Sequence, residues 1–135
     1  MAREHIRTWK VGDLEVSRIV EVYGFADNLG MLWEDGGAED LQRYPWLYPH
    51  FATPDGLMVI SFQAFVVKTP TRRIMVDTCL GNDRKRHFAV FNDLQTSFLD
   101  DIAAVGCPAE SIDTVLCTHL HFDHTGWMES GTWPA

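Results

Sequence analysis

The sequence predicts an α/β fold built as one domain, and three observations lead to this prediction. Its 135 residues suffice for a single modest core. Its hydrophobic fraction of 46% and aromatic fraction of 12% are typical of a globular protein. A strand, a helix and another strand are expected to follow one another between residues 73 and 118, which is the succession found in open α/β sheets.

The N-terminal part is expected to begin with a β-hairpin. Residues 8–11 and Leu14–Val22 alternate between polar and apolar side chains, and Gly12-Asp13 supplies the turn between them. Residues 24–56 then hold five glycines and three prolines, so we predict that this segment is mainly a long loop. Loops of this length are uncommon unless they have a function.

Two strands and a helix are expected next. Leu57–Lys68 is rich in β-branched and aromatic residues, and Thr69–Thr71 turns the chain into the apolar strand Arg73–Asp77. Ser97 and Asp100 then predict a capping box at the start of a helix. The apolar face of that helix consists of Leu94, Phe98, Ile102 and Val105.

Gly106 is expected to end this helix, since glycine is the usual residue just after a helix terminus. Pro108 is expected to start a short helical turn, which leads into a buried strand at Thr114–Thr118. The last residues, Ser130–Ala135, are expected to form a loop.

Four side chains that commonly bind metals lie within six residues after this strand: His119, His121, Asp123 and His124. Histidines two apart in an extended segment project to the same side, so His119 and His121 are expected to reach one ion. Asp123 and His124 follow where the chain leaves the strand and are expected to face a second ion. Gly126 permits the tight backbone path that this requires. Imidazole and carboxylate ligands suit zinc, with iron or manganese as alternatives.

Two metal ions this close together would hold a bridging hydroxide and polarise a carbonyl or phosphoryl oxygen. Asp123 is the candidate catalytic residue, because its carboxylate could take a proton or pass it to the leaving group. The weaker alternative is that the three histidines of the motif are ordinary surface or core residues of a turn. His5, His50 and His87 are each isolated, and we expect no ligand role for them.

The segment Thr118–Gly126 (THLHFDHTG) resembles the signature of the metallo-β-lactamase superfamily. Upstream, Val76–Gly81 (VDTCLG) is similar to that superfamily's first motif, a strand ending in Asp-Thr-Gly, with Cys79 where glycine is usual. The resemblance implies that Asp77 supports the metal loop without binding the metal itself. Among branches of the superfamily, the long early loop and residues 81–86 look most like the lactonase and organophosphate-hydrolase relatives.

The resemblance also implies a four-layer αββα sandwich, of which this chain supplies the first half. Residues 1–135 would then form a single, incomplete domain, with residues 24–56 as a loop on the substrate side and residues 114–127 as the strand and metal loop. In the family, the second half brings a third histidine, a bridging aspartate and a last histidine, whereas no histidine follows His124 here. Two protein ligands per ion fall short of the three that are usual. We favour a fragment; the alternative is that another chain completes the site in a homo-oligomer.

The early loop contains a group of aromatic residues: Trp33, Tyr44, Trp46, Tyr48 and Phe51. One interpretation is that they wall an apolar substrate pocket over the metals. The other, equally favoured, is that they cover the sheet as ordinary core.

The leading functional hypothesis is a zinc-dependent metallo-hydrolase that cleaves a lactone, ester or phosphotriester bond. A thioester hydrolase of the hydroxyacylglutathione type is an alternative, although Trp127 stands where that family usually has a second glycine. A non-catalytic metal-binding half-domain is the alternative from another class of protein.

Composition narrows the expected partners to a small-molecule substrate. Eleven basic against 19 acidic residues give a net charge of -8, which disfavours nucleic acid. The one basic cluster, Arg84–Arg86, is expected to be a solvated loop. No apolar run approaches the roughly 20 residues of a membrane span, and no signal peptide is visible at the N-terminus, so a cytoplasmic location is expected.

Three cysteines without a Cys-x-x-Cys pair suit reduced thiols in a reducing compartment: Cys79, Cys107 and Cys117. Cys117 lies in the apolar run after Val115 and is expected to be a buried structural thiol.

Overall fold

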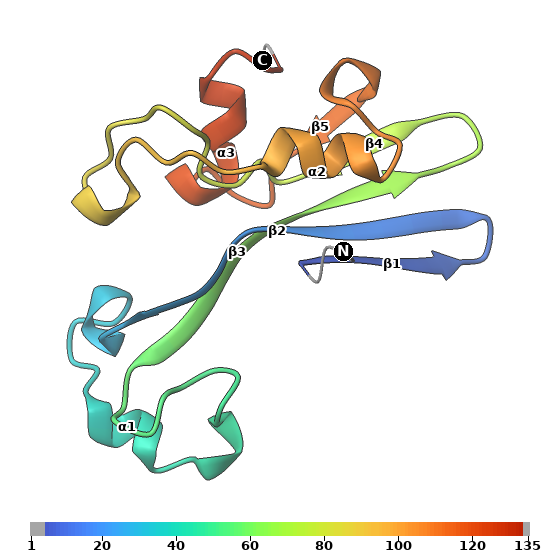
Figure 1. The fold of residues 1–135 in the computed structure, drawn as a ribbon. Coiled ribbons are helices and arrows are strands. Elements are labelled where there is room, and N and C mark those ends of the chain that lie inside the picture. The colour runs from blue at the N-terminus through green and yellow to red at the C-terminus, as the bar shows by residue number, and fades with distance from the viewer. Residues whose placement is uncertain (1–4, 134–135) are drawn as a thin grey trace. The chain divides into compact units, whose positions relative to one another are not determined.

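The structure, a computed structural model, describes residues 5–133. Five strands form one sheet in chain order (Figure 1): β1 (Ile6–Val11), β2 (Leu14–Asp27), β3 (Met58–Lys68), β4 (Arg73–Val76) and β5 (Thr114–Leu116). The described α-helices are α1 (Ala38–Gln42), α2 (Phe98–Ala104) and α3 (Phe122–Glu129). The pairs β1–β2 and β3–β4 are antiparallel, whereas β4 and β5 are parallel. The predicted α/β class and N-terminal hairpin are confirmed.

The chain divides into two compact units. The first consists of Met1–Glu21 with Phe62–Ala135, and the second of Val22–Ser61. The four predicted metal ligands and Asp77 all belong to the first unit, so the geometry of the candidate site can be described within it.

The core of the first unit is shared by its strands and by helices α2 and α3. Val66 and Met75 pair across β3 and β4, and both are fully buried. Phe98 and Ile102 of α2 belong to the same cluster, and the Phe98 ring stacks on Trp127 of α3 with 5.8 Å between ring centroids. Each such side chain contributes about 1.5–3 kcal/mol on burial. The predicted apolar face of this helix is therefore confirmed for Phe98 and Ile102.

The start of α2 differs from the prediction. The Ser97 hydroxyl does not close a capping box with Asp100 but donates a hydrogen bond to Oδ2 of Asp101 at 2.8 Å. Asp101 is only 2% exposed, so its carboxylate needs donors that the exposed Asp100 can obtain from water. His5, which was expected to be isolated, also contacts this carboxylate, with 3.0 Å between Nε2 and Oδ2.

The strand before the metal motif is shorter and less buried than predicted. It ends at Leu116 rather than at Thr118, and the Leu116 side chain is 52% exposed. Cys117 is half-buried rather than buried. The physical reason is that β5 lies at the edge of the described sheet and pairs only with β4. The short helical turn that Pro108 was expected to start is present at Ala109–Ser111.

The second unit is less irregular than predicted. Besides the ends of β2 and β3 it contains α1 and two 3₁₀ turns, at Leu29–Met31 and Pro45–Leu47. The Asp40 carboxylate accepts a hydrogen bond from the backbone N–H of Gly37 at 3.1 Å, which fixes the start of α1. The many glycines and prolines of residues 24–56 indicated a loop, but helices of three to five residues can form between them.

Helix α3 packs on the loop after β4 through Gly126. A Cβ atom at this position would lie 2.0 Å from the carbonyl oxygen of Leu80. We expect Gly126→Ala to lower the free energy of unfolding by about 3 kcal/mol or more, because the backbone of two segments would have to separate. Chemical denaturation monitored by circular dichroism measures this loss.

Gly30→Ala is the matched control. A Cβ atom at Gly30 would meet only the carbonyl oxygen of Gly36 at 3.6 Å, which is an ordinary contact. This variant should be neutral or more stable by about 0.5–1 kcal/mol, because alanine loses less conformational entropy on folding. Equal losses in the two variants would contradict the packing that we describe at Gly126.

Candidate metal site

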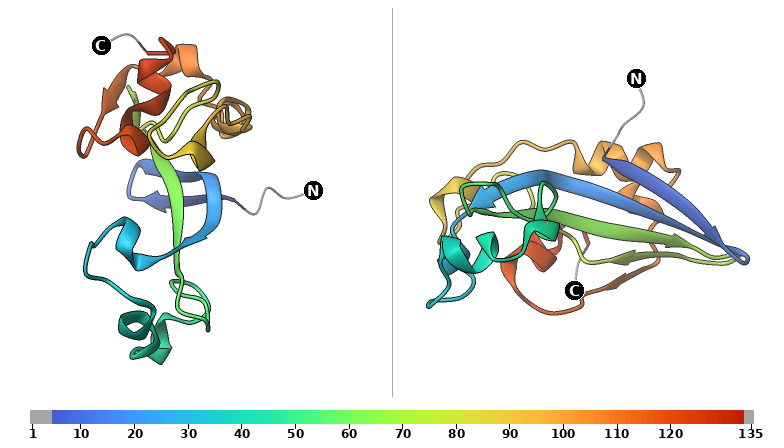
Figure 2. Two further views of the ribbon diagram at one scale, coloured as in Figure 1. Left: turned by 90° about the vertical axis from the view of Figure 1, so that its left-hand side faces the viewer. Right: turned by 90° about the horizontal axis from the view of Figure 1, so that it is seen from below.

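The predicted metal-binding motif follows β5 and lies beside the end of β4. Because these strands are parallel, with Val76 opposite Leu116, their carboxyl ends meet at one edge of the sheet. The backbone N–H of Asp77 extends the pairing by one hydrogen bond to Leu116, at 2.8 Å. Figure 2 shows the region from two further sides, with the segment from β5 into α3 in orange and red.

The second half of the motif lies in the first turn of α3, a helix that the sequence did not predict. His121 is the residue before the first helical turn, and Asp123 and His124 are inside it. The helix was missed because Thr125 and Gly126 have low helix propensity and the segment lacks an apolar stripe. An aspartate in the first turn suits the positive end of the helix dipole.

The structure brings the four predicted ligands together. The ring centroids of His119 and His124 are 3.9 Å apart, and those of His119 and His121 are 4.7 Å apart. Oδ2 of Asp123 lies 3.3 Å from Nε2 of His124. Three imidazoles and one carboxylate therefore share one small region, although His119 and His121 lie in irregular backbone rather than in an extended strand.

Asp77 lies against this region and binds the backbone of the motif. Its Oδ1 accepts a hydrogen bond from the N–H of Thr118 at 2.7 Å, and its Oδ2 accepts one from Nδ1 of His124 at 2.9 Å. Burial raises the pKa of Asp77, but the hydrogen bonds from Thr118 and His124 outweigh it and lower the pKa below its ordinary value. The carboxylate is therefore ionised and acts as an acceptor.

Thr118 connects Asp77 to two of the histidines, a role that the sequence analysis missed. Its Oγ1 lies 2.9 Å from Oδ2 of Asp77, 3.1 Å from Nδ1 of His119 and 3.2 Å from Nδ1 of His124. The hydroxyl has one proton, and the Asp77 carboxylate can only accept it. The hydroxyl can then accept a hydrogen bond from Nδ1–H of His119, whereas the single Nδ1–H of His124 is shared with Oδ2 of Asp77, which is the nearer acceptor at 2.9 Å. In these tautomers the Nε2 atom of each ring keeps its lone pair for a metal.

The loop after β4 interlocks with α3 through backbone hydrogen bonds. The N–H of Thr78 donates to the carbonyl of His124 at 2.8 Å, and the N–H of Gly126 donates to the carbonyl of Cys79 at 2.8 Å. This path puts Asp77 at φ 61° and Cys79 at φ 47°, in the region that favours glycine. Cys79 thus occupies the position where the resembling family has glycine. Burial raises the pKa of its thiol well above the usual range, so it stays protonated.

The donor atoms fit a pair of metal ions only in part. Within residues 5–133, no group of three or more His, Cys, Asp and Glu side chains is placed to hold one ion. Two ligand atoms of one tetrahedral zinc ion, each at about 2.0–2.2 Å from it, lie about 3.3–3.6 Å apart. The 3.3 Å between Asp123 Oδ2 and His124 Nε2 agrees with this spacing. This one spacing is compatible with a shared ion for these two side chains.

Arg86 was expected to lie in a solvated loop, and the structure contradicts this. Its side chain is 8% exposed and pairs with Glu129 at the end of α3, with 2.7 Å between Nη1 and Oε2. Nη2 donates to the carbonyl of Leu80 at 2.6 Å, and the guanidinium lies 5.6 Å from the ring centroid of Phe122. Arg86 can be buried because the Glu129 carboxylate and the Phe122 ring offset much of the free energy that burying its charge costs.

The aromatic residues of the early loop lie in the second unit. Trp33, Trp46 and Phe51 are 64%, 73% and 59% exposed, so the expectation that they belong to an ordinary core is wrong. Tyr44 is also exposed, at 48%, and Tyr48 is half-buried. Their role as a substrate-pocket wall stays a prediction.

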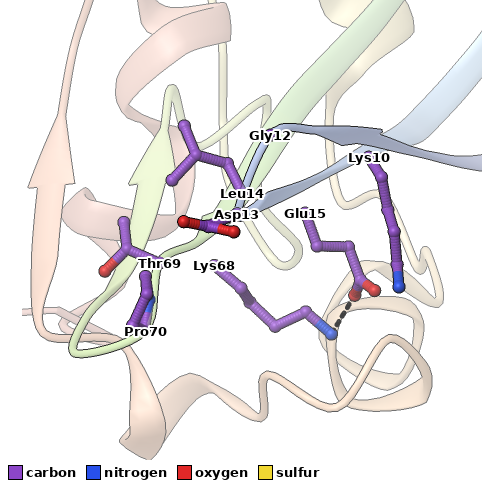
Figure 3. A pocket seen from close by; sticks show the side chains of 8 residues that line it. All are labelled: Lys10, Gly12, Asp13, Leu14, Glu15, Lys68, Thr69 and Pro70. Atoms are coloured by element: carbon purple, nitrogen blue, oxygen red, sulfur yellow. Dashed lines mark ion pairs between the residues drawn. The ribbon is translucent and has the colours of Figure 1, made fainter.

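A cleft in the first unit lies at the other end of β4 (Figure 3). It runs between the turn that joins β1 to β2 and the turn before β4, where Thr69 and Pro70 line it. Lys68 forms an ion pair with Glu15 inside the cleft and donates to the carbonyl of Val105 at 2.9 Å. Lys68 and Glu15 are thus paired within the chain, and none of the predicted site residues lines the cleft.

The model of the metallo-beta-lactamase superfamily matches residues 63–130, which is half of the chain. The chain therefore belongs to the metallo-β-lactamase superfamily. The match includes Asp77, the four predicted ligands and Thr118. No match was found among curated proteins.

Three solved structures share the fold. AidC, described as a dizinc quorum-quenching lactonase in complex with a product, is 24% identical with a TM-score of 0.66, and the alignment covers 90% of this chain and 38% of AidC. A probable metal-dependent hydrolase from Staphylococcus aureus is 20% identical with a TM-score of 0.64 and coverage of 87% and 42%. The hydrolase AbOPH is 19% identical with a TM-score of 0.59 and coverage of 93% and 39%. The chain spans about two fifths of the length of each, and so corresponds to part of this fold.

Asp77 is open to a direct test. In Asp77→Ala, Thr118 and His124 lose their shared acceptor, so we expect zinc affinity to fall about 10–100-fold. Competition with a chromophoric chelator measures this change. Asp113→Ala is the matched control, because Asp113 likewise accepts a backbone N–H bond, from Arg73 at 2.5 Å, but at the other end of β4. Unchanged zinc affinity in Asp77→Ala, or an equal fall in the control, would contradict the role.

The Arg86–Glu129 pair makes a pH-dependent contribution to stability. Burial raises the pKa of Glu129, but bonds from Thr125 and Arg86 outweigh it and hold the pKa below its ordinary value of 4.5. A carboxyl with a lowered pKa stabilises the fold above its unfolded pKa and loses that contribution as the pH falls through its folded pKa. Glu129→Gln should therefore cost on the order of 1 kcal/mol at pH 7, with the exposure of Glu129 limiting the loss.

Denaturation of Glu129→Gln and the wild type between pH 7 and pH 3 measures this difference. The two unfolding free energies should converge as the pH falls, while Glu110→Gln, an exposed site, should stay close to the wild type at pH 7. A constant difference across the range would show that the ionised carboxylate is not what stabilises the fold.

Proposed function

We propose that this chain carries the metal-binding motif of a zinc-dependent hydrolase that cleaves a lactone, an ester or a phosphotriester bond. The observation that carries the proposal is the gathering of three imidazoles and the Asp123 carboxylate at one edge of the sheet, in a chain of the metallo-β-lactamase superfamily. Iron or manganese would suit the same ligands.

Each pair of ligands would hold one ion. His119 and His121 would bind the first, and Asp123 with His124 the second, while Asp77 and Thr118 orient the rings from behind. When bound, the two ions would supply Lewis acidity and a nucleophile at neutral pH. The residues of the chain itself orient the ligands, and Asp123 would hold or release a proton at the leaving group. With two described ligands per ion, we propose that further ligands come from outside these residues or from a second copy of the chain.

Substrate class is proposed on two grounds. AidC is described as a lactonase, and its likeness to this chain makes a lactone the first substrate to test. A net charge of -8 disfavours nucleic acid. Among the helices of residues 5–133, none combines the length and apolar character needed to span a bilayer. We therefore propose a small-molecule substrate, and we propose a cytoplasmic location as a separate point.

The thioester alternative gains no support from the motif region. Trp127 stands where that family usually has glycine, and its side chain is 7% exposed and stacked on Phe98. A position filled in this way belongs to the core of this chain. The other alternative, a half-domain that binds metal without catalysis, predicts zinc binding without turnover, and the experiment below separates it from the hydrolase.

Zinc titration and turnover of a lactone and a phosphotriester test the proposal, in the assembly that supplies the further ligands of each ion. Loss of a partner of a ligand typically costs 10–100-fold in metal affinity, so His119→Ala and His124→Ala, which remove a ligand outright, should cost about 100-fold or more. His87→Ala is the control, because this histidine is exposed and lies outside the motif. Turnover should disappear with a chelator and return with zinc. Wild-type affinity in both motif variants would overturn the proposal, and zinc binding without turnover of either substrate would favour the half-domain.

A further inference from the structure

Glu21 of β2 is a partly buried carboxylate that binds two segments of the candidate metal site. Its Oε2 accepts a hydrogen bond from the backbone N–H of Leu80 at 2.6 Å. Its Oε1 accepts one from the indole Nε1 of Trp127 at 2.7 Å and one from the hydroxyl of Thr96 at 2.9 Å. Leu80 lies three residues after Asp77, and Trp127 lies three residues after His124. The carboxylate therefore touches both sides of the site without touching a predicted ligand.

Three separate elements meet at this side chain. Leu80 belongs to the loop after β4, Thr96 to the segment before α2, and Trp127 to α3. Within residues 5–133 the ion pairs include none to Glu21, so the charge is compensated by hydrogen-bond donors rather than by a cation. Burial raises the pKa of Glu21 above its ordinary value, against the opposing effect of the donors from Leu80, Trp127 and Thr96. Burying the Glu21 carboxylate costs free energy, which the hydrogen bonds from its donors offset. The same hydrogen bonds fix the positions of the donors.

We propose that Glu21 is a positioning residue of the candidate metal site, fixing the loop that follows Asp77 against the helix that carries Asp123 and His124. The inference rests on the proposed function. The two segments are also joined by backbone bonds, from Thr78 to His124 and from Gly126 to Cys79. A shift of Leu80 relative to Trp127 would therefore be transmitted to Asp77 and His124. Metal sites tolerate about 0.5 Å of such displacement.

Glutamine at this position isolates the effect of the charge and of its acceptors. Glu21→Gln keeps the shape of the side chain, but one of its two terminal atoms becomes an NH₂ donor. Both sides of the carboxylate face N–H groups, of Leu80 on one side and of Trp127 on the other. Whichever way the amide turns, one of these donors loses its acceptor, so the variant must displace either the loop or α3.

The experiment compares zinc affinity and the visible absorption spectrum of the cobalt(II) form in the wild type and three variants. These are Glu21→Gln, Trp127→Phe and the double variant, all measured below the onset of thermal unfolding. We expect Glu21→Gln to weaken zinc binding about tenfold and to change the cobalt spectrum, which reports ligand geometry. The double variant should lose less than the product of the two single effects, because the amide then faces no indole N–H.

Glu15→Gln is the matched control. Glu15 is on the same strand and, six residues away, on the same face as Glu21, but it pairs with Lys68 at the far end of the sheet. This variant should keep the wild-type affinity and spectrum even if its melting temperature falls.

Two outcomes overturn the inference, and they are distinguishable. If the wild type binds zinc and cobalt but Glu21→Gln and Trp127→Phe keep its affinity and spectrum, Glu21 is purely structural and the proposed function stands. If the wild type binds zinc and cobalt no more tightly than the His119→Ala and His124→Ala variants do, the proposed function fails and the inference fails with it. Altered spectra in Glu21→Gln but not in Glu15→Gln support the positioning role.

Discussion

The hydrogen bonds accepted by Asp77 determine how the candidate site is assembled. β4 and β5 are short, and their paired backbone ends at Val76 and Leu116. Beyond that point the segments that follow β4 and β5 stay together because of the Asp77 carboxylate. It accepts hydrogen bonds from the backbone N–H of Thr118, from the hydroxyl of Thr118 and from Nδ1–H of His124. An ionised acceptor makes such bonds shorter and stronger than neutral ones. The orientation of His119 follows from the same group through the Thr118 hydroxyl.

This arrangement requires the loop after β4 and helix α3 to approach as closely as backbone allows. Gly126 and Gly81 face each other there, and a Cβ atom at Gly81 would lie 2.8 Å from the carbonyl oxygen of Gly126. Cys79 adopts a positive φ in the same loop, at a cost of roughly 1–2 kcal/mol for a residue with a Cβ atom. The burial of its side chain, which is 0% exposed, offsets part of that cost. Strain is therefore concentrated in the few residues that connect Asp77 to α3.

The sequence predicted the parts of this structure whose signals are local. Alternation and β-branched runs placed β1 to β4, and the spacing of Phe98 and Ile102 placed the buried face of α2. Helix α3 could not be predicted, because its stability comes from tertiary bonds of Gly126 and Trp127 to the loop after β4, and its local propensity opposes it. The limited burial of β5 depends on which strands flank it, and this is a property of the whole sheet.

The site residues divide in the same way. His119, His121, Asp123 and His124 were found from their spacing, and Asp77 from a family motif, because both signals are contiguous in the chain. Thr118 was passed over although it precedes His119, since nothing in a single sequence shows that its hydroxyl contacts three partners. Glu21 is 106 residues from Trp127, and a glutamate in an alternating strand is ordinarily expected to face solvent. Only the assembled fold brings such a residue to the site.

The charges gathered here also bear on what the site can bind. After burial itself, the carboxylates of Glu21, Asp77 and Asp123 all raise the pKa of the Cys79 thiol, so their fields overlap at one place. Arg86 is a cation in the same unit, but Glu129 neutralises it. The three carboxylates and the neutralised Arg86 make the region negative overall. Such a field attracts divalent cations and opposes anionic ligands that arrive without them. Binding of a cation would reduce the repulsion between these neighbouring carboxylates. The carboxylates that orient the histidines therefore also favour a metal ion over an anionic group at this edge of the sheet.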